Sequence, residues 1–273
     1  MDSINTNLDA LNVQNNITNA QNSYAKAISQ ISSGLRINTA ADDPSGLATL
    51  NSLQTAQAGT TQAQSNVAQA SSFLQTADGG MASMVTILNQ MYSLAVESNS
   101  SATSTVDAGY NEDVFKADVT ALDNFVSNTN YNGTKLLNTV ATFKFQTGSL
   151  SGNTSSITAT NLTTTIGTAL TSTAAGVGSA TTAALAEGLI TTAIAAVDSY
   201  RASIGASEQQ FQATATFLQA SSQNLSASIS TVGDANIAQQ TTNLATSQVL
   251  GQAANAMLAQ ANAQPAQVLT LLR

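Results

Sequence analysis

The chain has 273 residues, of which only 8% are charged, with 7 Lys and Arg, 15 Asp and Glu and a net charge of −8. Soluble domains usually carry about 25% charged residues, and nucleic-acid binders need clustered Lys and Arg, so both an ordinary monomer and a nucleic-acid partner are disfavoured. The absence of Cys and His excludes disulfides, zinc fingers, cysteine nucleophiles and imidazole ligands. Most familiar enzyme chemistry is excluded with them.

The beginning of the chain predicts a helix with one narrow apolar stripe. Its apolar residues recur at steps of four and three: Val13, Ile17, Ala20, Tyr24, Ala27 and Ile31. No basic segment leads into an apolar core, as it does in a secretory signal, and no apolar run approaches the ~20 residues that span a bilayer. We expect a chain that is not inserted in a membrane and that is soluble or leaves the cell by a route that reads no cleaved signal peptide.

A second, longer helix is predicted to start where Asp42 and Asp43 precede Pro44. A carboxylate there can cap free amides and proline suits the first helical position, so we prefer capping to a metal pair. Its apolar stripe runs from Leu53 to Ala95, about 65 Å at ~1.5 Å per residue. Two adjacent glycines, residues 79 and 80, each cost roughly 1 kcal/mol relative to Ala and are candidates for a bend or break.

The middle of the chain changes character. Asn111, which two acidic residues follow, predicts another helix start, and the Asn132-Gly133 pair predicts the turn that ends this helical run. Beyond it, Phe143 and Phe145 alternate with polar neighbours, and residues 150–182 are dense in Ser, Thr and Gly. These patterns predict short strands and loops.

The last third of the chain predicts a second long helical stripe, from Ile190 to Val232. Arg201 and Glu208 interrupt it; they could form a buried catalytic pair, but polar residues in such a stripe more often fix helix register, which we favour. Between Gln209 and Leu272, only one residue is charged. A helix face without charge is a poor solvent face, so we expect other copies of the chain to cover it.

Four segments resemble motifs of the bacterial flagellins. ISSGLRINTAADDPSGLA (31–48) resembles the N-terminal signature of that family, and SLAVESNSS (93–101) and NYNGTKLL (130–137) resemble two further motifs in the usual order. MLAQANAQPAQVLTLLR (257–273) resembles the family's C-terminal end. The likeness covers about the first 140 and last 90 residues. The charged neighbours that commonly precede the leucine-alanine-valine motif are absent here.

The resemblance implies a mainly α fold in which long coiled-coil helices from both termini pack together, with a small central β-hairpin and loop region. Residues 1–44 and 231–273 would form an inner tube. Residues 45–230 would form an outer helical rod with a small β region at about 138–182, and the middle of the chain would face solvent.

The resemblance also implies a function: a structural subunit, not an enzyme, that polymerises into the extracellular flagellar filament used for swimming. Expected partners are further copies of the chain, the flagellar type III export apparatus, an export chaperone, and the filament cap and hook-junction proteins. The alternatives are a hook-filament junction protein and a surface flagellin homologue that binds polysaccharide.

Candidate subunit-interface residues follow from the four matched segments and the uncharged C-terminal stretch. They are Ile31, Leu35, Arg36, Asn38, Asp42, Asp43, Leu94, Val96, Leu250, Met257, Leu258, Gln260, Asn262, Leu269, Leu272 and Arg273.

Overall fold

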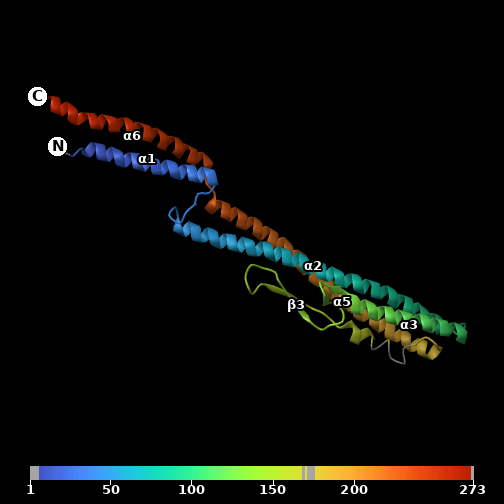
Figure 1. The fold of residues 1–273 in the computed structure, drawn as a ribbon. Helices are drawn as coiled ribbons and strands as arrows, with labels where there is room; N and C mark the ends of the chain where they lie inside the picture. Colours follow the sequence, from blue (N-terminus) through green and yellow to red (C-terminus); the bar gives the residue numbers. More distant parts are fainter. Residues whose placement is uncertain (1–5, 168–169, 171–175, 272–273) are drawn as a thin grey trace. The chain divides into compact units, whose positions relative to one another are not determined.

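The computed structural model describes residues 6–167, 170 and 176–271. Long helices dominate it (Figure 1): α1 (Leu8–Ser33), α2 (Pro44–Ser98), α3 (Thr105–Asn128), α5 (Ala180–Gly233) and α6 (Ile237–Leu271). The strands are short and lie between α3 and α5 in the sequence. The predicted fold class, mainly α with a small central β region, is confirmed.

Contacts between residues divide the chain into two compact units. The first, called the terminal unit here, consists of Met1–Ala56 and Gln223–Arg273. The second, called the central unit, consists of Gln57–Ser222. Both ends of the chain therefore belong to one unit, and the middle of the chain belongs to the other.

The core of the central unit lies among α2, α3 and α5. Large apolar side chains from these helices are fully buried there, among them Leu74, Met81, Met84, Leu88 and Met91 of α2, Phe115 and Leu122 of α3, and Ile190, Val197, Ile204 and Phe211 of α5. The steps of three and four that the sequence shows place these side chains on one face of each helix. The two long predicted stripes are thus the contact faces of α2 and α5.

Helix α2 continues without interruption through the two adjacent glycines, so no break occurs there. The tertiary contacts of the helix outweigh the weak helix propensity of these residues. Gly80 lies close to the chain that follows α3, because a Cβ at this position would be 2.6 Å from Oγ1 of Thr129. Gly79 faces open space.

Helix α3 begins earlier than the sequence suggested, and the predicted start at Asn111 is wrong. The helix starts at Thr105, where the hydroxyl of Ser104 accepts the Asp107 N–H at 3.2 Å and donates to the Asp107 carboxylate at 2.6 Å. The hydroxyl of Ser104 thus satisfies one free amide of the first turn. Asn111 instead donates its side-chain amide to the hydroxyl of Ser98, at 3.1 Å.

Two antiparallel hairpins follow α3. Strands β1 (Asn130–Tyr131) and β2 (Thr134–Lys135) are joined by the predicted Asn132-Gly133 turn, whose φ angles of 48° and 78° are both positive. Strands β3 (Thr142–Gln146) and β4 (Thr154–Thr158) form the second hairpin. A short π-helix, η1 (Thr163–Gly167), then leads toward α5.

Part of the middle of the chain packs into the core, while other side chains of this region, such as Val140 and Leu150, are exposed. Phe73 of α2 makes edge-to-face contacts with Tyr131, Phe143 and Phe145, with ring centroids 4.8–5.9 Å apart. Phe145 also contacts Phe211, at 5.9 Å. Further along, the side chains of Ile157, Leu162, Ile166, Leu170 and Val177 are buried. The polar composition of this segment hid the apolar residues that anchor it.

Polar side chains link α2 and α5 by hydrogen bonds at several places along the central unit, one of them between Gln57 and Ser222, at 2.8 Å. The guanidinium of Arg201 donates to both oxygens of Asp78, at 2.7 and 3.4 Å, and this contact raises its pKa. Gln75 donates to the carboxylate of Glu208 at 3.2 Å. Arg201 and Glu208 therefore pair with α2 side chains at the edge of the apolar contact, as the register interpretation predicts.

Among the described residues, α5 is long and apolar enough to pass a composition test for a membrane span, with a window of mean hydropathy 1.5. Core helices of soluble proteins pass the same test. Here Ile190, Val197 and Ile204 of α5 are buried within the protein core.

Candidate functional site

In the terminal unit, α1 and α6 run side by side (Figure 1). The residues buried in this unit's helix pair are small or polar: Ala20, Ala27 and Gln30 of α1, and Ser247 and Ala261 of α6. Asn7 caps α1 by accepting the Ala10 N–H at 2.9 Å and donates its amide to the Ala261 carbonyl at 2.8 Å. The contact is close but buries little apolar area.

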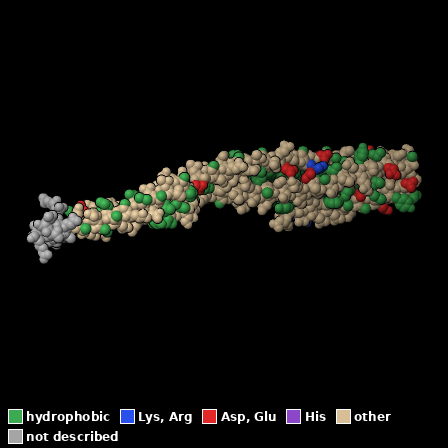
Figure 2. Space-filling view, turned by 90° about the horizontal axis from the view of Figure 1, so that it is seen from above, with side chains coloured by type: hydrophobic (Ala, Val, Ile, Leu, Met, Phe, Trp, Pro, Cys, Tyr) green, Lys and Arg blue, Asp and Glu red, His purple; other side chains and the backbone are tan. Residues whose placement is uncertain are grey.

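Large apolar side chains of the same helices lie on the outside. Leu8 is 58% exposed on α1, and Leu250 and Met257 are 56% and 59% exposed on α6. Leu11 and Val249 are exposed as well. Figure 2 shows apolar side chains (green) at the surface and only sparse charged ones. The fully buried residues of α1 and α6 that the structure describes are thus small or polar, whereas several large apolar side chains of these helices are exposed.

A short backbone ladder joins the two links that connect the helices of the terminal unit. Leu35 pairs with Asp234 as an isolated antiparallel bridge. On either side, the Arg36 N–H donates to the Gly233 carbonyl at 2.7 Å and the Ala235 N–H donates to the Gly34 carbonyl at 2.9 Å. The links after α1 and before α6 are thus held together by main-chain hydrogen bonds.

The side chain of Arg36 reinforces this ladder. Its Nε and one terminal nitrogen donate to the Val232 carbonyl at 3.2 and 2.8 Å, and the guanidinium lies 3.8 Å from the Asp43 carboxylate. The side-chain amide of Gln30, which is buried, donates to the Arg36 carbonyl at 2.5 Å. Arg36 is therefore held within its own chain on both its backbone and its side chain.

Asp42 organises the link between α1 and α2. Its carboxylate accepts the N–H groups of Asn38 and Thr39 at 3.2 and 3.0 Å and lies 2.8 Å from the ammonium of Lys26. The hydrogen bond from Lys26, helped by those from Thr39 and Asn38, lowers the pKa of Asp42 from 3.8 to about 2. The side chain of Asn38 donates to Ser29 at 3.0 Å.

Asp43 caps α2, as predicted. The helix begins at Pro44, and Oδ1 of Asp43 accepts the Gly46 N–H at 2.8 Å. No group of three or more Cys, His, Asp or Glu that could hold a metal ion occurs among the residues that the structure describes. Asp42 and Asp43 thus form hydrogen bonds that stabilise the link and the start of α2 within their own chain.

The remaining candidate interface residues occupy different surroundings. Leu250, Met257, Gln260 and Asn262 are exposed on α6, and Leu258 and Ile31 are half-buried. Leu94 is half-buried and Val96 exposed, both on the part of α2 that belongs to the central unit. Leu272 and Arg273 lie outside the described residues, as does the side chain of Leu269.

The sequence did not single out several residues that shape this site. Lys26 and Gln30 hold the links, and Asn7 connects the start of α1 to α6. Of these, only Asn7 carried a recognisable signal, since Asn is a favoured N-cap residue. The partner of Lys26 is set by the tertiary fold and has no local pattern.

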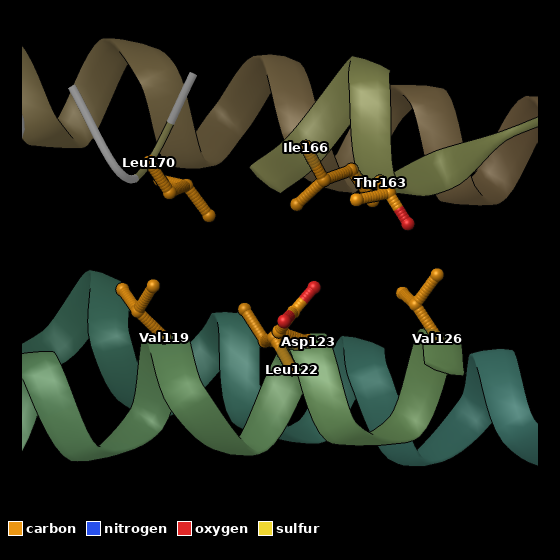
Figure 3. Close-up of a pocket in the computed structure, with 7 residues that line it drawn as sticks. All are labelled: Val119, Leu122, Asp123, Val126, Thr163, Ile166 and Leu170. Atoms are coloured by element: carbon orange, nitrogen blue, oxygen red, sulfur yellow. The ribbon is translucent and has the colours of Figure 1, made fainter. Parts of the chain in front are cut away.

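A small apolar pocket lies elsewhere, between α3 and η1 (Figure 3). Val119, Leu122 and Val126 of α3 face Ile166 and Leu170 across it, with Thr163 and Asp123 completing the lining. Asp123 is the one acidic group in this lining, so the pocket offers no paired acid and base.

The fold and the site define a helical structural protein in which both ends of one chain pair and expose few charges and several large apolar side chains. Comparison with known proteins gives the family. Residues 4–142 match the bacterial flagellin N-terminal helical region, and residues 188–272 match the bacterial flagellin C-terminal helical region. The chain belongs to the bacterial flagellin family.

Relatives extend over nearly the whole chain. A flagellin of Halalkalibacterium halodurans is 35% identical and a flagellin of Bacillus subtilis is 30% identical, each alignment covering 99% of both chains. A flagellar filament 33 kDa core protein of Treponema phagedenis is also 30% identical, with the same coverage. The crystal structure of Bacillus cereus flagellin has a TM-score of 0.52 at 23% identity, covering 56% of this chain and 88% of that chain, which supports the fold.

Proposed function

We propose that this flagellin polymerises through its terminal unit, in which α1 and α6 become buried among the same helices of neighbouring copies. As a flagellin, the chain is a structural subunit of the bacterial flagellar filament, an extracellular polymer used for swimming. The proposal rests on which apolar side chains are exposed. Leu250 and Met257 of α6 are exposed, whereas Ala27 of α1 is buried.

Neighbouring copies would cover the apolar side chains that α1 and α6 expose in the single chain. Burial of apolar surface contributes roughly 25 cal/mol per Å², and an exposed leucine or methionine contributes this only when another surface covers it. Between Gln209 and Leu272 a single charged residue, Asp234, would have to be accommodated. A contact that repeats head to tail without closing produces a helical filament.

In this proposal residues 1–44 and 231–273 form the inner tube, and residues 45–230 form the outer rod with its β region at about 138–182. Two kinds of interface residue then follow. Leu250, Met257, Leu258, Gln260 and Asn262 would contact other copies directly, and so would Leu269, Leu272 and Arg273. Arg36, Asn38, Asp42 and Asp43 would fix the links that position α1 and α6, next to Ile31 and Leu35.

On the central unit, Leu94 and Val96 would contribute a further contact from α2. Val96 is exposed and Leu94 half-buried, so part of this surface is available to a neighbouring copy.

Other partners are proposed from family membership. The subunit would travel through the flagellar type III export apparatus, with an export chaperone in the cell and with the cap and hook-junction proteins at the two ends of the filament. Its work is mechanical, so we propose no catalytic activity, no cofactor and no nucleic-acid or membrane partner. The lack of Cys and the presence of only 2 Pro suit passage of an unfolded chain, because disulfides and slow prolyl isomerisation are then minor obstacles.

The two alternatives are not favoured. A polysaccharide-binding homologue would need aromatic rings lining an open groove, whereas Tyr131, Phe143 and Phe145 pack around Phe73. A hook-filament junction protein would share the terminal helices, but the full-length relatives reported above are flagellins and a filament core protein.

Seeded polymerisation tests the proposal. Purified protein is mixed with short fragments of its own filament and observed by negative-stain electron microscopy, beside a variant that ends at Asp234 and so lacks α6. We expect long filaments from the full chain and none from the shortened chain. Growth of the shortened chain at the full-length rate would overturn the role given to α6.

A further inference from the structure

The β3–β4 hairpin rests on α2 at three points, all within the central unit. Its rings at Phe143 and Phe145 contact Phe73, and the side-chain amide of Asn66 donates to the Gln146 carbonyl at 3.0 Å. The third point is Gly59, where the turn of the hairpin meets the helix. These three positions on α2 are seven residues apart, so they lie on one face of the helix.

Contact at Gly59 is close because this residue has no side chain. A Cβ built there would be 2.8 Å from Cβ of Ser149 and 3.1 Å from its Cα. The nearest obstacles are a Cβ and the main chain, which cannot rotate away as the end of a long side chain can. Glycine inside a helix is less favourable than alanine. The close approach of the hairpin turn gives a physical reason for glycine at this position.

We propose that Gly59 is a positioning residue that seats the turn of the β3–β4 hairpin on α2 and thereby fixes the place of the whole hairpin. With alanine at this position the turn has to move outward. The displacement pulls on Gln146 and on the two phenylalanine rings, which precede the turn on β3. The hairpin is held internally by its ladder, so it shifts as a unit.

The second part of the proposal rests on the polymerisation argued above. The turn carries Leu150, whose side chain is 70% exposed. If filament subunits pack side by side, a hairpin displaced from its seat presents a different outer surface and fits less well between neighbouring copies. The seat at Gly59 therefore sets the shape with which the central unit enters the filament.

Gly59→Ala tests the seat, and the same helix provides a matched control. Gly79 also lies inside α2 but faces open space, so Gly79→Ala adds the same methyl group and the same helix propensity without a collision. A compensating variant is also available. Ser149→Gly removes the Cβ at 2.8 Å and leaves the Cα at 3.1 Å, so the double variant Gly59→Ala with Ser149→Gly should restore part of the close fit of the turn on α2.

Amide hydrogen exchange on the soluble monomer measures the hairpin directly. We expect Gly59→Ala to speed exchange within residues 142–158 roughly tenfold, because overpacking of this kind weakens a local contact by about that factor. Gly79→Ala should leave these amides unchanged. Gly59→Ala should speed exchange less in a Ser149→Gly background than in the wild-type background. Unchanged exchange in Gly59→Ala, or no recovery in the double variant, would overturn the proposal that Gly59 positions the hairpin on α2.

Seeded growth then tests whether the position of the hairpin on α2 affects filament assembly. Gly59→Ala should extend wild-type seeds at least about fivefold more slowly than Gly79→Ala, with recovery in the double variant. Equal growth rates together with altered exchange would overturn the link between the hairpin and assembly. Failure of the wild-type chain to grow would contradict the proposed function, and the exchange experiment would still decide the seat.

Discussion

The terminal and central units are built from the same kind of helix, yet they bury different residues. In the central unit, Phe115, Leu88 and Met91 are enclosed. In the helix pair of the terminal unit, the enclosed residues include Ala20 and Ala27, while larger apolar side chains such as Leu8, Leu250 and Met257 are exposed. Apolar spacing thus determines that a helix forms a contact face, and the size of the side chains on that face determines whether one partner is enough.

The difference has an energetic meaning. Full burial of a leucine, phenylalanine or methionine contributes roughly 1.5–3 kcal/mol, and ordering of the backbone opposes folding by about 1–2 kcal/mol per residue. Helices that bury alanine gain too little to offset that entropy alone. We therefore expect the central unit to fold in the single chain and the terminal unit to depend on neighbouring copies.

The strongest way to break the comparison is a charge on the outer face of α6. Leu250→Asp should raise the critical concentration for polymerisation at least about a hundredfold, because an unpaired carboxylate would be buried between copies. Leu185→Asp is the control, since this leucine is 55% exposed on α5 of the central unit. An equal loss of polymerisation in both variants would contradict the special role of the terminal unit.

Phe73→Ala should destabilise the central unit by about 3–5 kcal/mol, the usual range for removing a buried phenylalanine. Its ring contacts three other rings from the middle of the chain. Phe217→Ala is the matched control, since that ring is 69% exposed, and should change stability by less than about 0.5 kcal/mol. Denaturant unfolding of the monomer measures both. Similar values for the two variants would show that the middle does not belong to the core.

A smaller effect is expected from Ser104→Ala, which removes the N-cap of α3. The central unit should lose about 1 kcal/mol of stability, because the Asp107 amide loses its acceptor. Ser101→Ala, in the loop just before the helix, serves as a control. Assembly should be preserved, because the change lies in the central unit, which we expect to fold in the single chain. A loss of polymerisation in Ser104→Ala at temperatures well below its melting point would contradict the division into a self-folding central unit and a terminal unit that depends on neighbouring copies.

The smallest effect appears only in acid. Because folding lowers the pKa of Asp42 from 3.8 to about 2, its ionised form stabilises the link above pH 4, and that contribution is lost as the pH falls from about 4 toward 2. Asp42→Asn should lack this component, so its filaments should differ from wild type above pH 4 and approach wild type near pH 2. Dissociation is followed by light scattering. A difference in dissociation between wild type and Asp42→Asn that stays constant between about pH 4 and pH 2 would show that Asp42 is not the titrating group.

Much of this architecture could be predicted from the sequence. The stripes ending at Ala95 and Val232 identified the contact faces of α2 and α5, and the Asp43-Pro44 pair located the start of α2. Such signals are local, because spacing and capping act within a few residues. The start of α3 was missed because Asn111 and the acids after it imitate a cap, while Ser104 was the residue that bonds to the first turn.

What the sequence could not supply were contacts between distant segments. The ladder between Arg36 and Gly233 joins residues almost two hundred positions apart. The burial of Ile157 and Val177 was equally hidden, since Ser and Thr surround them and no periodic stripe marks them. Most candidate interface residues remain predictions, because a neighbouring copy decides which exposed side chains become buried.

Amide exchange of the terminal helices in monomer and in filament tests the central claim most directly. The account predicts fast exchange of residues 8–33 and 237–262 in the monomer, strong protection of the same residues in the filament, and strong protection of the α2, α3 and α5 core in both. Equal protection of the terminal helices in monomer and filament would contradict it, because the terminal unit would then be stable without its neighbours.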